Sequence, residues 1–112
     1  MINLTEQEKA LRLMAKRRGL KVRPDKRLRL TPFRAMHPRA AKELDQPCPK
    51  ATITYDPRIV TTRRKRVMDI RHEIIENDEM GKGKRYKSAH KVANRKQRTI
   101  SREERKLLGM DE

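Results

Sequence analysis

The fold of this chain is decided by residues 61–97, which read TTRRKRVMDIRHEIIENDEMGKGKRYKSAHKVANRKQ. Apolar residues recur there at helical spacing after a pair of threonines, either of which can act as the N-cap. The sequence therefore predicts a helix from Thr61 or Thr62 to about Met80. Its apolar face carries Val67, Ile70 and Ile74, and Met68 and Ile75 widen it.

A second helix is predicted from about Tyr86 to Gln97, after a break at the glycines of Gly81-Lys-Gly. Tyr86, Ala89, His90 and Ala93 follow one another at i, i+3, i+4 and i+7, so they share one face. Small alanines on that face allow a close approach to the preceding helix. We therefore expect an antiparallel helical hairpin.

Outside the hairpin the chain carries weaker signals. Thr5 and Glu8 form a capping-box pattern for an N-terminal helix that ends at Gly19, and Ser101 is placed to cap a last short helix. Short strands are expected at 20–23 and 51–55, and residues 24–50 are expected to be mostly extended, with a short helix over Arg39–Leu44. The predicted fold class is α+β, predominantly helical, with a short two-stranded element. The whole chain is expected to be one small basic domain with four parts, 1–23, 24–50, 51–97 and 98–112.

The charge of the chain indicates the class of its partner. Thirty-one lysines and arginines oppose fifteen acids, for a net charge of +16 over 112 residues. Nucleic acid is the first candidate, because neutralised phosphates release condensed counterions, whereas an anionic membrane or an acidic protein fits less specifically. A single cysteine, no signal peptide and no long apolar run indicate a cytoplasmic protein that does not span a membrane.

Two basic clusters are the predicted contacts to phosphate. One opens the long helix, where positive side chains oppose the helix dipole unless an anion offsets them. The other covers the glycine turn and the start of the second helix, where the backbone can approach a phosphate closely. The predicted contact residues are Arg63, Arg64, Arg66, Lys82, Lys84, Arg85, Lys87 and Lys91.

The hairpin also holds a candidate metal site. His72 and Glu76 lie four residues apart and therefore on one face of the long helix, with Glu73 about 100° round from His72. His90 lies on the facing stripe of the second helix, so these three side chains can converge. The spacing of His37 and Cys48 matches no zinc pattern, and both are expected to be bystanders.

The string HEIIE at 72–76 resembles the helix motif of zincin-type metallopeptidases, in which two ligands flank a glutamate base. HEIIE followed by YKSAHKVA is also similar to small uncharacterised phage and archaeal proteins. The zincin resemblance implies zinc bound by His72, Glu76 and His90, with Glu73 as the base. Glu76 stands where a zincin has its second histidine, and no G-x-x-H signature follows.

Several alternatives stay open at this point. His90 could simply hydrogen-bond to Glu76, or the site could hold a structural zinc or a hydrolytic one. The first functional hypothesis is a non-enzymatic protein, of phage or other mobile-element origin, that contacts the phosphate backbone of DNA or structured RNA. The second is a zinc-dependent hydrolase, and the third is an inhibitor that occupies the nucleic-acid groove of a host enzyme. The choice between DNA and RNA and the oligomeric state stay open.

Overall fold

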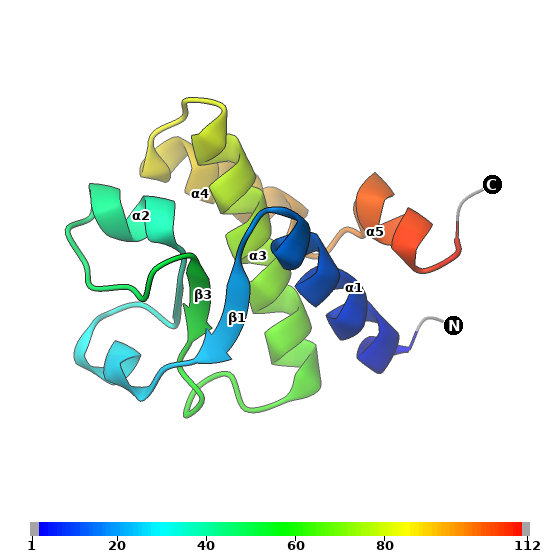
Figure 1. Cartoon of the computed structure of the whole chain (residues 1–112), viewed down its shortest axis with the longest axis horizontal. Helices are drawn as coiled ribbons and strands as arrows, with labels where there is room; N and C mark the ends of the chain where they lie inside the picture. The colour runs from blue at the N-terminus through cyan, green and yellow to red at the C-terminus, as the bar shows by residue number, and fades with distance from the viewer. Residues whose placement is uncertain (1–2, 111–112) are drawn as a thin grey trace.

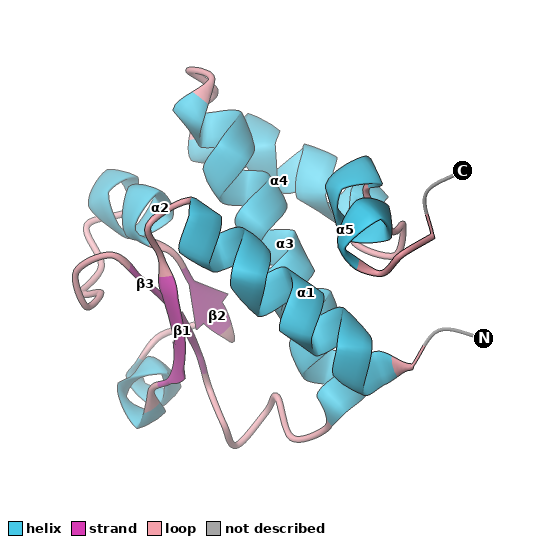
Figure 2. Cartoon of the chain, turned by 45° about the vertical axis from the view of Figure 1, so that its right-hand side comes forward, coloured by secondary structure: helices cyan, strands magenta, loops and turns pink. Residues whose placement is uncertain are grey.

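A computed structural model describes residues 3–110 and has the predicted α+β, mostly helical architecture (Figure 1). Several helices surround one small mixed sheet, and α3 runs through the middle of the molecule (Figure 2). The helices are α1 (Leu4–Arg17), the 3-10 helix η1 (Lys26–Leu30), α2 (Pro38–Glu43), α3 (Arg63–Gly81), α4 (Tyr86–Lys96) and α5 (Arg102–Leu107). The strands are β1 (Lys21–Pro24), β2 (Ala35–Met36) and β3 (Thr52–Tyr55).

The two predicted strands pair with each other, and a third strand joins them. The order is β1-β3-β2, with β1 parallel and β2 antiparallel to the central β3. A parallel pair needs a long crossover connection, which residues 25–51 supply. That segment was expected to be mostly extended, and it contains η1 and β2 besides the short helix α2, which overlaps the range predicted for it.

The apolar face predicted for the long helix forms the core. Ile70 and Ile74 are 1% and 2% exposed and pack between α1 and the central strand β3. Each buried side chain of this size contributes about 1.5–3 kcal/mol relative to its exposed state. The other buried members of this cluster are Leu11, Met14, Ala15, Ile53 and Val67.

The helical hairpin forms as the alanine stripe predicts. Ala89 and Ala93 are fully buried, and α4 lies along α3 (Figure 2). The turn between the helices contains Gly83 at φ +106°, a conformation that other residues rarely adopt. The close approach of the two helices brings the polar side chains beside the alanines toward α3.

The N-cap of α1 differs from the prediction. Asn3 is the cap, and its Oδ1 accepts a hydrogen bond from Thr5 N at 2.7 Å, so Thr5 lies within the first turn. Glu8 makes no capping box, because its carboxylate binds arginines of α1 and α3. Thr62 and Ser101 do cap α3 and α5, accepting from the backbone of Lys65 and Glu104.

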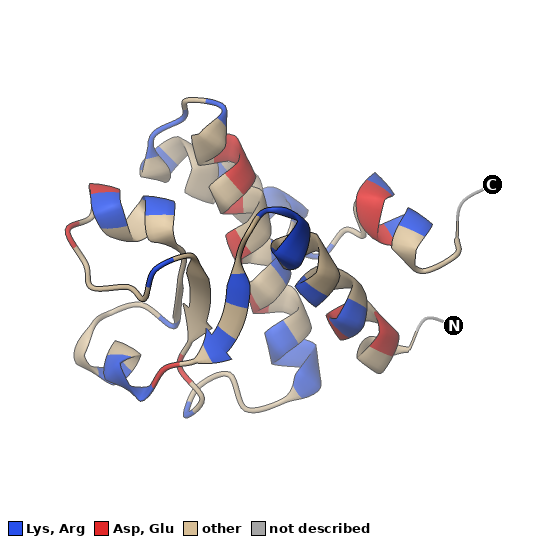
Figure 3. Ribbon diagram, in the orientation of Figure 1, with Lys and Arg blue, Asp and Glu red and all other residues tan. Residues whose placement is uncertain are grey.

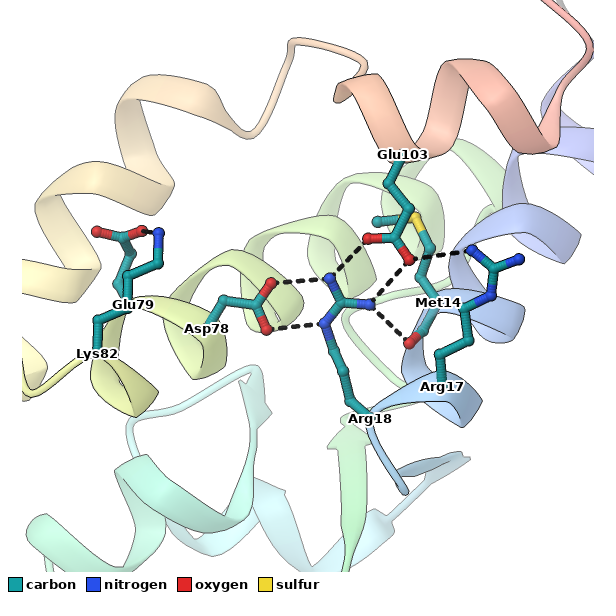
Figure 4. A network of polar contacts seen from close by, with 7 residues as sticks. All are labelled: Met14, Arg17, Arg18, Asp78, Glu79, Lys82 and Glu103. Atoms are coloured by element: carbon teal, nitrogen blue, oxygen red, sulfur yellow. Dashed lines mark hydrogen bonds and ion pairs between the residues drawn. The ribbon is translucent and has the colours of Figure 1, made fainter.

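Arg18 ties three helices together (Figure 4). It forms a two-pronged ion pair with Asp78 of α3 at 2.7 and 2.9 Å and reaches Glu103 of α5 at 2.7 Å. The same guanidinium donates to the carbonyl oxygen of Met14 in α1 at 2.8 Å. The planar guanidinium of Arg18 can donate to several oxygens at once, so it holds α5 against α1 and α3. Within residues 3–110, no helix is long and apolar enough to cross a membrane.

We expect Ile74→Ala to lower the free energy of unfolding by about 2–5 kcal/mol, because it leaves a cavity between α1, α3 and β3. Urea denaturation followed by circular dichroism measures this change. The matched control is Leu30→Ala, since Leu30 is 80% exposed and its truncation should change stability by less than about 0.5 kcal/mol. Equal effects of the two substitutions would contradict this assignment of the core.

Candidate metal centre

The structure brings the three predicted ligands together. His72 Nε2 and His90 Nδ1 lie 2.7 and 2.6 Å from the same carboxylate oxygen, Glu76 Oε2, and 3.3 Å from each other. His72 and Glu76 are one turn apart on α3, and the buried alanines of α4 hold His90 opposite them. This cluster could hold a metal ion.

Gln97, which follows α4, fixes the ring of His72. Its Oε1 lies 2.8 Å from His72 Nδ1, and because an amide oxygen only accepts, Nδ1 carries the proton. The other ring nitrogen, Nε2, faces Glu76 and His90, and in its protonated form it donates to Glu76 Oε2 at 2.7 Å. Histidines that bind metals are held in this way, with the second ring nitrogen donating to an oxygen.

His37 is part of the cluster, which corrects the expectation that it is a bystander. It is fully buried at the start of α2, where its Nδ1 accepts a hydrogen bond from Ala40 N at 3.4 Å. The proton is therefore on Nε2, which donates to Glu76 Oε1 at 3.0 Å. His37 thus orients the carboxylate of Glu76 through the oxygen that does not contact His72 and His90. In the sequence, Pro38 marks His37 as a candidate N-cap, because proline is favoured in the first turn of a helix.

Glu76 is a buried anion among imidazoles. Burial opposes its ionisation, yet hydrogen bonds from His37, His72 and His90 hold the pKa of Glu76 at about 2. Burial likewise opposes the positive charge of His72, but its hydrogen bond to Glu76 raises the pKa of His72 above its usual value. The cluster therefore favours a positive charge beside Glu76, supplied by a proton or by a metal ion.

Glu73 lies on the buried side of α3, next to this cluster. It is 5% exposed, and its Oε1 has no hydrogen-bond partner among the described residues. Burial, reinforced by the negative charges of Glu76 and Asp69, raises the pKa of Glu73 well above its usual range. With His37 and Glu76 it forms a second group whose atoms could hold a metal ion. The hydrogen bond from Ala40 leaves His37 as a donor there, which favours the first group.

A cavity of about 540 Å³ opens beside the three predicted ligands. Residues of the segment 32–36, of α3 and of α4 line it, and Glu73 is among them. The side chain of His90 is 40% exposed, whereas that of Glu76 is 2% exposed. An ion between these side chains would therefore be reachable from the cavity.

The predicted phosphate contacts fall into two groups at opposite ends of α3 (Figure 3). The 19 residues of α3 place these ends about 27 Å apart. Internal acids pair with most of the predicted residues: Glu8 with Arg63 and Arg66, Glu79 with Lys82 and Lys84, and Glu43 with Arg85. Within residues 3–110, the exposed members that make no ion pair are Arg64, Lys87 and Lys91.

Comparisons with protein-family models, with curated proteins and with solved structures find no match to this chain.

Proposed function

We propose that the chain is a zinc-dependent hydrolase whose ion is bound by His72, Glu76 and His90. The observation that carries this proposal is the convergence of Nε2, Oε2 and Nδ1 of these residues on one point at the wall of an open cavity. Two histidines and one glutamate form one of the ligand sets that catalytic zinc uses, with the fourth position left to water or substrate.

One of the three distances between the ligand atoms already matches a zinc site. Two ligands on zinc with bonds of about 2.05 Å are separated by about 3.3 Å, which is the distance between His72 Nε2 and His90 Nδ1. Glu76 Oε2 lies closer to both nitrogens, at hydrogen-bond distance, so it would move outward by about 0.6 Å on binding. Gln97 and His37 hold two of the three ligands in orientation from the outer side.

Glu73 is the proposed general base. A bound zinc ion lowers the pKa of its water to near 7. Glu73 lines the same cavity and has one carboxylate oxygen without a hydrogen-bond partner among the described residues. These features support the role that the HEIIE motif suggests for this residue.

A second candidate function is binding of nucleic acid through its phosphates, without catalysis. It is favoured by the net charge of +16 and by exposed cations that no acid neutralises within the described residues. Because Arg63, Arg66, Lys82, Lys84 and Arg85 pair internally, the proposal now depends on the remaining members of the predicted set. These are Arg64, Lys87 and Lys91.

The first prediction is that the purified chain retains one zinc ion. Native mass spectrometry should detect one zinc per chain, and His90→Ala should remove it. Asn94→Ala is the matched control, because Asn94 lines the same cavity one turn further along α4 and should leave the zinc bound. A folded wild-type chain that takes up no zinc would leave the cluster as a hydrogen-bonded packing element.

The second prediction concerns Glu73. Glu73→Gln should reduce hydrolysis by at least 100-fold while zinc stays bound, because the amide keeps the shape of the acid but cannot accept a proton. Labelled casein and a labelled single-stranded oligonucleotide serve as the two test substrates. Loss of both zinc and fold in this variant would instead assign Glu73 a structural role.

The third prediction tests phosphate contacts. The double variant Arg64→Ala and Lys91→Ala should bind a labelled oligonucleotide more weakly in all sequences tested and should lower the slope of log K against log salt by about 2. Arg63→Ala with Lys82→Ala removes the same charge from residues that pair internally, and should change the slope less. An unchanged slope in the first variant would argue against these contacts.

A further inference from the structure

A second hollow lies next to the cavity of the candidate metal centre. It has a volume of about 610 Å³ and lies between α1, α3 and the residues that follow α4. The two hollows share Met68 and Arg98 in their walls. Arg64, Met68 and His72 are spaced at i, i+4 and i+8, so one face of α3 forms the floor of both. We call these two adjacent hollows the α3 groove.

Arginines lie along the whole α3 groove. Arg98 is exposed at the junction of the two hollows, and Arg64 is exposed at the end away from His72. Neither makes an ion pair with the rest of the described chain. Arg34 lines the other side of the metal cavity, where it pairs with Asp69 at 3.0 Å and keeps a half-exposed side chain. These arginines lie on a path that leads to the ligands, where the cavity wall also carries the acids Asp69, Glu73 and Glu76.

The length of this path fits a short run of nucleotides. From Arg64 to His72 the helix rises by about 12 Å, whereas phosphates follow one another about every 3.4 Å along a stacked strand. Three or four nucleotides therefore span the distance. Arg98 then faces an inner phosphate, and the ion position faces the phosphate at the end of the path.

Aromatic side chains gather at the same place. The chain has three aromatic residues, and two of them, Phe33 and Tyr86, line the metal cavity. Tyr86 stacks on His90 with ring centroids 5.3 Å apart, which holds its ring beside the candidate ligands. Unpaired bases stack on aromatic rings with about 1–3 kcal/mol per base, whereas the bases of a duplex are already stacked. The aromatic residues therefore favour a single strand over a duplex.

From these features we infer that the α3 groove binds single-stranded nucleic acid and presents a phosphodiester to the metal centre. The inference rests on the proposed hydrolase and gives it a substrate class. In the reaction, water forms a new P–O bond and the ester P–O bond to one sugar oxygen breaks. The proton that water gives up passes to Glu73, and Glu73 returns it to the leaving sugar oxygen, so that no proton is gained or lost overall. The products are one phosphate monoester end and one hydroxyl end.

Fluorescence anisotropy with a labelled 12-nucleotide single strand tests the groove, using the full chain with and without zinc. We expect Arg98→Ala to weaken binding at least tenfold in both states, and Arg98→Lys to weaken it less. The matched control is Arg29→Ala, which removes the same charge from an exposed residue of η1 that lines neither hollow. It should weaken binding by less than about threefold, since it loses only a diffuse electrostatic attraction.

Three results would overturn the inference. They are equal losses for Arg98→Ala and Arg29→Ala, a duplex of the same length that binds as tightly as the single strand, and a polyglutamate peptide that displaces the strand at equal charge concentration. Circular dichroism of Arg98→Ala checks that the variant is folded, and the single Arg64→Ala variant gives a second measurement in the groove. A loss of binding in folded Arg64→Ala that exceeds the loss in Arg29→Ala supports the groove.

The same samples separate this inference from the proposed function. Specific binding of the single strand without cleavage by the zinc-loaded chain would uphold the groove and count against the hydrolase. Cleavage of casein with no specific binding of the single strand would uphold the hydrolase and overturn the groove. Cleavage of the single strand that Arg98→Ala slows by weakening binding supports both.

Discussion

The buried carboxylate of Glu76 is the interaction on which this structure depends. One carboxylate accepts hydrogen bonds from histidines of α2, α3 and α4, so segments far apart in the sequence meet at a single side chain. A buried charge that loses its partner costs about 3–5 kcal/mol, which makes each of these contacts costly to break. The same arrangement provides two nitrogens and one oxygen on the cavity side, where a metal ion can replace a proton.

The acids of the chain serve mainly to hold basic segments in place. Arg18 joins α1, α3 and α5 through Asp78 and Glu103, and Arg71 of α3 is held by the fully buried Glu104 of α5 at 2.7 and 2.9 Å. Arginines and lysines to which the sequence alone assigns no partner are therefore paired with acids in the folded chain. The cations without an internal ion pair are available to contact a polyanion. Two of them, Arg64 and Arg98, line the α3 groove.

Much of the hairpin could be predicted because local spacing controls it. The stripe of Val67, Ile70 and Ile74, the break at the glycines and the alanines of α4 act through neighbours in sequence, and each lies where the spacing placed it. The placement of Glu8 could not be predicted in this way. Its capping-box position is a local signal, but arginines from α1 and α3 compete for the carboxylate in the folded chain. A similar competition pairs five of the predicted phosphate contacts with internal acids.

The sequence by itself determined the hairpin of α3 and α4, the terminal helices α1 and α5, and the meeting of His72, Glu76 and His90, because helical periodicity and small residues fix which faces adjoin. Only the tertiary structure decided the parallel pairing of β1 with β3, the position of His37 beside Glu76 and the placement of two adjacent hollows along α3. These features arise from segments brought together by the crossover of residues 25–51 and by the packing of α1 on α3. Contacts of this kind depend on long-range packing, which leaves no local pattern in the chain.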